Sequence, residues 1–221
     1  MTAIIRHLER RDFEAAADLQ RRVYRSIPAF SRQQFESLLT IFPQGQFVAE
    51  LDGKLVGIAI SLVILLDDYS LHHTWAHVTN NGNFDTHNMK GRTLYGAEVC
   101  VDLGCRGKGI GHHLYEARRK LSRAMNLKRI IAGGRLPGYH EYATQMAPEE
   151  YAKRVIWGDI YDPVLRFQLD EGFDYCGILH GYLPTDPESI GNAALIVWLN
   201  RAYDPTQPTR LPPADFLEES P

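Results

Sequence analysis

Cysteine, long apolar runs and a strong net charge are all scarce in this sequence of 221 residues. The chain has 3 cysteines, an odd number without the spacing of a disulfide framework, which favours a reducing, cytoplasmic compartment. No apolar run approaches the roughly 20 residues of a membrane-spanning helix, and residues 1–6 lack the pattern of a signal peptide. The formal net charge is −3, which argues against broad binding to nucleic acid.

A glycine-rich segment, residues 106–111, is the most informative feature that the sequence does contain. It reads Arg-Gly-Lys-Gly-Ile-Gly and follows an apolar run, residues 94–103, that is typical of a buried strand. After it, apolar residues recur at helical spacing, at Ile110, Leu114, Ala117, Leu121 and Met125. The same periodicity predicts that four basic side chains face solvent, namely Arg118, Arg119, Lys120 and Arg123. A glycine turn between a strand and a helix N-terminus offers unpaired amides and a positive dipole, which together bind phosphate. The plainer alternative is a glycine-rich turn that merely opens a basic helix.

The spacing of this segment distinguishes between known phosphate-binding loops. It is not a P-loop, because no Gly-Lys-Ser/Thr follows at the required distance, and the Gly-x-Gly-x-x-Gly of dinucleotide folds is absent. It does resemble Arg/Gln-x-x-Gly-x-Gly/Ala, the pyrophosphate loop of the GNAT acyltransferase superfamily. The lead-in, residues 101–106, is similar to that family's Val-x-Pro-x-x-Arg, with Leu103 where proline is common.

A second segment, residues 162–173, extends the resemblance. Asp162 can cap a short helix, Pro163 suits its first position and Gly172 can end it. GNAT proteins carry a helix ending in Gly-Phe at this distance, followed by a strand, so the resemblance covers residues 3–203 in order. The chain also resembles the acyltransferase domain found N-terminal to nitrilase-type hydrolases, over residues 132–140, 146–151 and 161–165. The hydrolase part is absent from the 221 residues, so its amidase activity is not carried over.

The element order predicts an α/β fold with a mixed sheet and helices on both faces, as in the GNAT fold. Strands are expected over residues 3–8, 46–51, 54–65, 94–103, 129–133, 173–183 and 193–199, with Asp52-Gly53 as a hairpin turn. Helices are expected from Asp12, from the capping box at Ser31 to Thr40, after the glycine segment and after Asp162. Residues 1–203 form one predicted domain, and residues 204–221 form a proline-rich tail that is expected to be extended on the surface.

The resemblance implies acetyl-CoA as the acyl-donor co-substrate, with no metal. The residues implied to hold it are Val99, Cys100 and Val101, through their backbones, and Arg106, Gly107, Lys108, Gly109, Ile110 and Gly111 around the pyrophosphate. A metal pair at His73 and His77 is disfavoured, because no intervening glutamate or third ligand has a recognisable spacing.

Direct transfer to an amine requires a base, because an amine that is protonated at neutral pH cannot attack a thioester. Glu98 is the candidate, as the only carboxylate inside the glycine-loop strand, and burial there would raise its pKa. Strand alternation also allows it to be an outward-facing structural residue. Many GNAT enzymes protonate the departing thiolate with a tyrosine, but Gln168 stands at that position here. Tyr161 or water is then left to deliver the proton.

Two long segments are expected to shape the acceptor site. Residues 67–92 read as a long polar loop, and an insertion over residues 135–158 is rich in aromatics. Those aromatics either wall a pocket or merely cover the end of the sheet. The candidate substrate residues in the insertion are Arg135, Tyr139 and His140.

The function expected is that of an N-acetyltransferase acting on an amine of a small molecule. The alternatives are a non-catalytic module that binds acyl-CoA, which the missing tyrosine permits, and, less favoured, a protein N-acetyltransferase. Neither nucleic acid nor a membrane is an expected partner, and a homodimer is compatible with the sequence.

Overall fold

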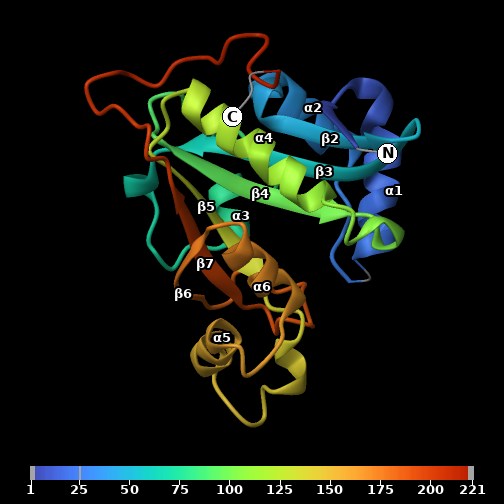
Figure 1. Ribbon diagram of the computed structural model, residues 1–221, viewed down its shortest axis with the longest axis vertical. Helices are drawn as coiled ribbons and strands as arrows, with labels where there is room; N and C mark the ends of the chain where they lie inside the picture. Colours follow the sequence, from blue (N-terminus) through green and yellow to red (C-terminus); the bar gives the residue numbers. More distant parts are fainter. Residues whose placement is uncertain (1–2, 25, 219–221) are drawn as a thin grey trace.

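The computed structural model describes residues 3–24 and 26–218, which form a mixed α/β fold around a seven-stranded sheet (Figure 1). The strand order is β1-β2-β3-β4-β5-β7-β6, with β4 and β5 parallel and the other neighbours antiparallel. The strands are β1 (Ile4–His7), β2 (Gln46–Leu51), β3 (Lys54–Ile64), β4 (Thr93–Val101), β5 (Arg129–Arg135), β6 (Asp174–Leu179) and β7 (Ala193–Leu199). The predicted fold class is confirmed.

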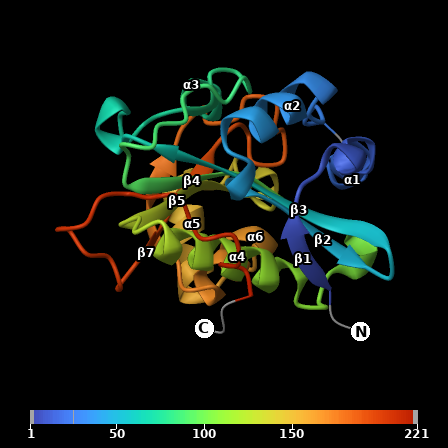
Figure 2. The ribbon, with the colours of Figure 1, turned by 90° about the horizontal axis from the view of Figure 1, so that it is seen from above.

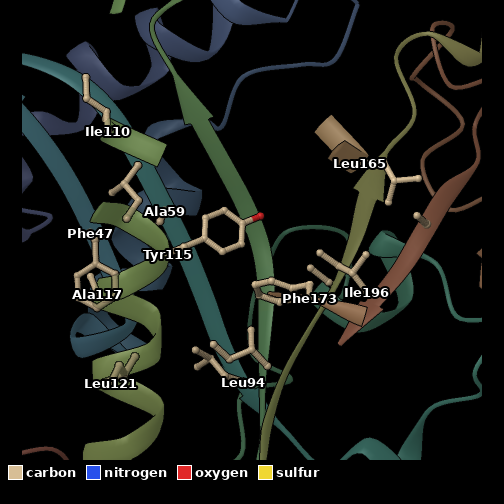
Figure 3. Packing of buried hydrophobic residues seen from close by; sticks show 14 of the residues in the cluster. Phe47, Ala59, Leu94, Ile110, Tyr115, Ala117, Leu121, Leu165, Phe173 and Ile196 are labelled. Atoms are coloured by element: carbon tan, nitrogen blue, oxygen red, sulfur yellow. The ribbon is translucent and has the colours of Figure 1, made fainter. Parts of the chain in front are cut away.

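Helices cover both faces of the sheet (Figure 2). They are α1 (Phe13–Val23), α2 (Arg32–Ile41), α3 (Trp75–Thr79), α4 (Ile110–Ala124), α5 (Pro148–Trp157) and α6 (Pro163–Asp170). The first three lie on one face; α4 and α6 lie on the other, with α5 beside α6. Each face has its own apolar cluster, and Figure 3 shows Ala117 and Leu121 of α4 near Phe47 of β2. Within the described residues, no helix has both the length and the apolar character needed to cross a membrane.

Local sequence signals explain most element boundaries. Ser31 and the residue three positions later form the predicted capping box of α2. Asp52 and Gly53 both have positive φ, at 52° and 73°, as the predicted hairpin turn between β2 and β3 requires. Gly172 has a φ of 80°, so it ends α6 in the left-handed conformation that glycine adopts without strain.

The segment predicted as a long loop and the insertion, for which no helix was predicted, both contain helices. Residues 67–92 include α3, which Thr74 caps by accepting a hydrogen bond from the His77 amide at 3.1 Å. The insertion contains α5, which begins at Pro148 and ends at Gly158, whose φ is 87°. Proline at the first position and glycine after the last are signals that could have revealed α5.

Arg118 and Arg119 also depart from the pattern expected of α4. Periodicity predicts that both face solvent, but their exposed fractions are 2% and 6%. Arg118 donates to carbonyl groups of the sheet, and Arg119 pairs with Glu116 and Glu171. The prediction is wrong for these two, because fixed polar partners permit charged side chains to be buried.

The proline-rich tail packs along α4. Asn126 donates to the carbonyls of Asp204 and Gln207 at 2.9 Å, and Lys120 donates to that of Leu217 at 2.8 Å. Phe216 is buried against Phe47 and His7. The tail therefore covers the outer side of α4 and the β2 end of the core, whereas its division from the domain at residue 203 stays a prediction.

The sheet opens between its two parallel strands. β4 pairs with β5 only from Thr93 to Gly96, and among the described residues its other five positions have no partner on that side. On the β3 side the register shifts, because Ile60 faces Glu98 while the next residue of β3 faces Gly96, which leaves Ala97 as the extra residue of a bulge. Figure 1 shows β4 and β5 diverging toward their C-terminal ends. The divergence leaves part of β4 exposed as an open backbone edge.

Asp162 ties α6 to the insertion. It is fully buried, and its Oδ1 accepts hydrogen bonds from the amides of Val164 and Leu165, both at 3.0 Å. Its Oδ2 accepts from the Gly138 amide at 3.1 Å and the Tyr151 hydroxyl at 2.8 Å. One carboxylate thus serves as the helix cap and as the anchor of two insertion segments.

We expect Asp162→Ala to lower the free energy of unfolding by about 2–4 kcal/mol, because the cap is lost and two further buried donors lose their acceptor. Tyr151→Phe removes only one of the donors and should lower it by about 1 kcal/mol. Urea denaturation followed by circular dichroism gives both values. Equal losses in the two variants would contradict the anchoring role of Asp162.

Candidate functional site

The glycine-rich segment forms a loop between the end of β4 and α4. Asp102 opens a short turn by accepting a hydrogen bond from the Gly104 amide at 3.0 Å, and it pairs with Arg22 at 3.2 Å. Gly107 and Gly109 both have a φ of 76°, which a residue with a Cβ rarely adopts. Gly109 is the N-cap of α4. The two glycines therefore let the chain double back sharply onto the helix.

The amides of this loop are free to bind an anion. Within residues 3–24 and 26–218, no group accepts a hydrogen bond from the amides of residues 106–112. Arg106 and Lys108 are exposed, and neither forms an ion pair with the described residues. Free amides, the positive end of a 15-residue helix and two available cations make a binding site for phosphate groups.

The last two residues of the segment have a different surrounding. Ile110 is buried in the core beneath α4. A Cβ on Gly111 would lie 2.8 Å from the ring of Phe167, so this glycine lets α6 approach α4. Gly111 therefore has a packing role, whatever its amide binds.

The open edge of β4 presents backbone groups of alternate residues. The Asp102 amide donates to the Val56 carbonyl, so residues of β4 with the parity of Asp102, including Cys100, pair with β3. The backbones of Val99 and Val101 consequently face the gap toward β5. Among the three residues expected to contact pantetheine, these two present amides there, while Cys100 is buried with its backbone turned to β3.

Glu98 lies at the bulge, with its carboxylate on the α1 side of the sheet. Oε1 accepts a hydrogen bond from the Tyr24 hydroxyl at 2.7 Å, and Oε2 accepts one from the Gln20 side chain at 3.5 Å. Burial raises the pKa of Glu98, while the hydrogen bond from Tyr24 and the positive charges of Arg118 and Arg135 act to lower it. The direction agrees with the upward shift expected from burial, and the role of Glu98 as the base stays a prediction.

Tyr24 and Gln20 were not among the residues predicted for the site. They lie 74 and 78 positions from Glu98 in the sequence, one helical turn apart at the end of α1. Tyr24 also donates to the Val99 carbonyl at 3.0 Å, so it contacts both the carboxylate and the open edge. The sequence signal that could have found them is the polar pair at i, i+4 on a helix whose other inward residues are apolar.

The two candidate sources of the leaving-group proton differ in their surroundings. Gln168 is buried against Gly134, and its Nε2 donates to the Tyr115 hydroxyl at 3.3 Å. It occupies the inner side of α6, where its amide has no acidic proton to give. Tyr161 precedes α6 with 75% of its surface exposed, and no described residue shares a hydrogen bond with its hydroxyl. The structure does not bring Tyr161 into contact with Glu98 or Tyr24.

Of the three candidate substrate residues, Arg135 lines a cavity. It donates to both carboxylate oxygens of Asp186, at 2.6 and 2.7 Å, and to Glu188 at 2.6 Å. Its guanidinium lies over the Tyr24 ring, 5.2 Å from the centroid. A cavity of about 90 Å³ opens there, lined by Tyr24, Ser26, Ile27, Arg135, Asp186, Pro187 and Glu188. Tyr24, which lines this cavity, also donates a hydrogen bond to Glu98, whereas Glu98 itself is not among the lining residues.

Tyr139 and His140 do not line that cavity. Tyr139 is 5% exposed, packs against Tyr151 and donates to the Met146 carbonyl at 3.2 Å. His140 is exposed, with its Nδ1 2.9 Å from the Pro137 carbonyl. In the insertion the tyrosines pack together over the sheet end rather than form a wall of this cavity.

The two histidines considered as a metal pair, His73 and His77, make contacts with different residues. His73 is 2% exposed with its Nδ1 2.9 Å from the Ser70 carbonyl, and His77 packs against Tyr69. Among the described residues, no group of three or more His, Cys, Asp or Glu side chains is arranged to hold a metal ion.

Comparison with known proteins matches residues 4–143 to the acetyltransferase (GNAT) family. The chain is 44% identical over 207 residues to the probable hydrolase YhcX of Bacillus subtilis (strain 168), covering 94% of this chain but only 40% of that protein's length. It is 33% identical over 174 residues to the uncharacterized N-acetyltransferase YkwB of the same organism, covering 79% of this chain and 76% of that protein. Among solved structures, the GphF GNAT-like decarboxylase in complex with isobutyryl-CoA has the same fold, with a TM-score of 0.77 and 23% identity over 89% of this chain and 98% of that one.

Proposed function

Because this chain belongs to the GNAT acetyltransferase family, we propose that it transfers an acetyl group from acetyl-CoA directly to an amine of a small molecule. The observation that carries the proposal is the placement of three parts around the gap between β4 and β5. The loop of free amides follows the C-terminal end of β4, and the open backbone edge of β4 runs along the gap. The Glu98 carboxylate, with Tyr24, lies on the α1 side of the sheet.

The loop and the open edge fit an acyl-CoA donor. The amides of residues 106–112, together with Arg106 and Lys108, would hold the pyrophosphate. The amides of Val99 and Val101 would pair with the pantetheine arm and with the carbonyl oxygen of the acyl group, on which negative charge develops during attack. The GNAT-like decarboxylase of the same fold was solved with isobutyryl-CoA, which supports a CoA thioester as the donor.

Glu98 would accept the proton that the acceptor amine loses. The amine nitrogen forms a bond to the acyl carbon, the carbon–sulfur bond breaks, and the thiolate that leaves takes up a proton. Tyr24 holds the Glu98 carboxylate in place, and burial keeps its pKa above the usual range, so it is a stronger base than an exposed glutamate. Tyr161 or water would supply the proton to the thiolate.

The cavity at Arg135 supports a small acceptor. Its volume of about 90 Å³ accommodates a group of a few atoms, and Asp186 and Glu188 bring carboxylates to its wall. Both are paired with Arg135, and the one negative charge that Arg135 leaves unbalanced would attract an ammonium group before it is deprotonated.

A non-catalytic acyl-CoA-binding module is the second candidate, and Gln168 is the observation that favours it. An amide buried at the position of the family's tyrosine cannot protonate a thiolate. Acetyl transfer to protein N-termini or lysines is the third and less favoured candidate.

Thioester turnover separates these candidates. The purified protein is incubated with acetyl-CoA and a panel of small amines, amino acids and peptides, and released CoA is measured with a thiol reagent. Acceptor-dependent release from a small amine supports the proposal, and release only with peptides favours the third candidate. Tight binding of acetyl-CoA without release by any acceptor would favour the binding module.

Arg106→Ala should weaken CoA binding by about 1–3 kcal/mol, which is roughly 5- to 150-fold in Kd. The loss is partial because the loop amides and the helix dipole remain. Lys128→Ala, at a basic residue just before β5 and away from the loop, serves as the control in the same calorimetric titration. A change in turnover with unaltered CoA affinity would contradict the role of Arg106.

A further inference from the structure

Arg118 is a buried cation with no use in the chemistry described above. It lies on the sheet-facing side of α4 with 2% of its surface exposed. Its Nε donates to the Ser61 hydroxyl at 3.0 Å, and its Nη2 donates to the carbonyls of Ile60, at 2.7 Å, and Glu98. No carboxylate oxygen in the described part of the chain forms an ion pair with it. A buried charge without such a pair is expensive, and burial lowers the pKa of Arg118 accordingly.

The partners of Arg118 coincide with the bulge of β4. Ile60 and Glu98 face each other across β3 and β4 at the last position before the register shifts, and Ser61 is the next residue of β3. From the other face of the sheet, the Trp75 indole donates to the carbonyl of Ala97, the extra residue, at 3.0 Å. Arg118 and Trp75 thus hold the bulge from both sides.

Gly96 makes room for this arrangement. A Cβ at Gly96 would lie 3.0 Å from Nη1 of Arg118, which is tighter than ordinary contact. An apolar side chain at position 118 would pack against the sheet without the desolvation penalty of a guanidinium. It would leave the carbonyls of Ile60 and Glu98 without their side-chain donor.

We propose that Arg118 is a positioning residue for acyl transfer, which holds the β4 bulge so that the Glu98 carboxylate faces α1 while the Val99 and Val101 amides face the gap. This inference rests on the proposed function. The groups that face Glu98 are Gln20 of α1 and Tyr24 at its C-terminal end, Arg135 from β5 and Arg118 from α4, and the charge of Glu98 also acts on the side chains of Cys100 and Tyr182. The other titratable group against Arg118 is Tyr115, whose ring centroid lies 5.7 Å from the guanidinium carbon.

The test compares Arg118→Met with Arg119→Met. The control removes a neighbouring buried arginine of the same helix whose partners, Glu116 and Glu171, lie away from the bulge. For Arg118→Met we expect kcat to fall by about 10-fold or more with KM for acetyl-CoA nearly unchanged, because displacement of a reacting group by a fraction of an ångström acts on the transfer step. The acidic limb of the kcat profile should move to higher pH, because Glu98 loses a nearby positive charge that lowers its pKa. Arg118→Lys, which keeps the charge, should restore the position of the limb in part.

A folded Arg118→Met protein with the kcat and acidic limb of the wild type overturns the proposal. If Arg118→Met does not fold, the proposal is tested with Ser61→Ala instead. This variant removes one hydrogen-bond acceptor of Arg118 and leaves the guanidinium charge in place. A fall in kcat of about 3-fold at constant KM supports the proposal, and an unchanged kcat overturns it.

Direct titration of Glu98 separates this inference from the proposed function. The carboxyl carbon is followed by NMR in 13C-glutamate-labelled protein, with Glu98→Gln to assign the signal. If the pKa of Glu98 is higher in Arg118→Met and turnover survives in Glu98→Gln, then Arg118 does position Glu98, but Glu98 is not the base. If the pKa of Glu98 is unchanged in Arg118→Met and turnover is lost in Glu98→Gln, then Glu98 is the base, but Arg118 does not position it.

Discussion

Glu98→Gln is expected to lower turnover by about 100-fold or more while the affinity for acetyl-CoA stays at the wild-type value. Glutamine keeps the size of the side chain, and its carbonyl oxygen can still accept the hydrogen bond that Tyr24 donates to Glu98. It cannot take up a proton at neutral pH. Steady-state turnover and calorimetric binding of CoA on the same preparation separate the chemical role of Glu98 from its structural one.

The pH profile gives a second, independent measurement. Burial raises the pKa of Glu98, so the carboxylate becomes protonated, and the wild-type rate falls, at a higher pH than for an exposed glutamate. In Glu98→Gln this acidic limb should flatten. Amines of different pKa distinguish the ionisation of the acceptor from that of the protein. If the acidic limb shifts with the pKa of the amine, it reports the acceptor and not Glu98.

Glu50→Gln is the matched control. Glu50 is also a strand carboxylate with a side-chain partner, Arg6 at 2.9 Å. It lies on β2, which is two strands away from β4 in the sheet. Near-normal turnover and an unchanged profile in Glu98→Gln would make Glu98 a structural strand residue. Proton removal would then pass to water or to His140.

Local patterns predicted those parts of the fold that local interactions decide. The capping box at Ser31, the Asp52-Gly53 turn and the cap at Asp162 each satisfy backbone groups within a few residues, so their sequence signals are sufficient. The same holds for the glycine loop, whose φ angles follow from the positions of Gly107 and Gly109.

The surroundings of Glu98 could not be predicted in this way, because they depend on pairing between distant segments. Tyr24 reaches the carboxylate from the C-terminal end of α1, and the i, i+4 pair that it forms with Gln20 indicates an inward polar position without identifying its partner, Glu98. Periodicity assigned Arg118 to solvent because charged residues on a helix usually face water. Its true environment depends on a bulge in β4, which Gly96 inside the strand suggests without specifying which residue is the extra one or what packs against it.

The insertion illustrates the same limit. Its aromatics were expected either to wall a pocket or to cover the sheet end, and composition alone cannot choose between these. In the structure Tyr139 and Tyr151 pack together, and the Tyr151 hydroxyl donates a hydrogen bond to Asp162. The cavity near Glu98 is instead lined by Arg135, Asp186 and Glu188, where a residue at the end of β5 meets a loop some 50 positions later in the chain.

Gly109→Val is expected to weaken CoA binding by at least about 100-fold, because it removes the approach of several loop amides to the pyrophosphate at once. Each hydrogen bond to a charged group contributes about 1.5–3 kcal/mol, so the loss of two or more exceeds the roughly 2.7 kcal/mol that corresponds to 100-fold. Position 109 has a φ of 76°, and the nearest atom to an added Cβ, Nε2 of His113, is 3.9 Å away. The substitution therefore acts through backbone strain and through a branched side chain above the amides, with no clash in the core.

Gly53→Val provides the control that isolates the strain. Gly53 has nearly the same φ, 73°, with nothing within 4 Å of an added Cβ, and it lies in the β2–β3 turn rather than in the loop. Both variants should lose about 1–2 kcal/mol of stability from the left-handed conformation of a residue with a Cβ. Only Gly109→Val should lose CoA in calorimetry, and wild-type protein should bind NADP⁺ and ATP far more weakly than CoA. If Gly109→Val binds CoA as the wild type does, the donor is held elsewhere, and the free amides of the loop have no part in its recognition.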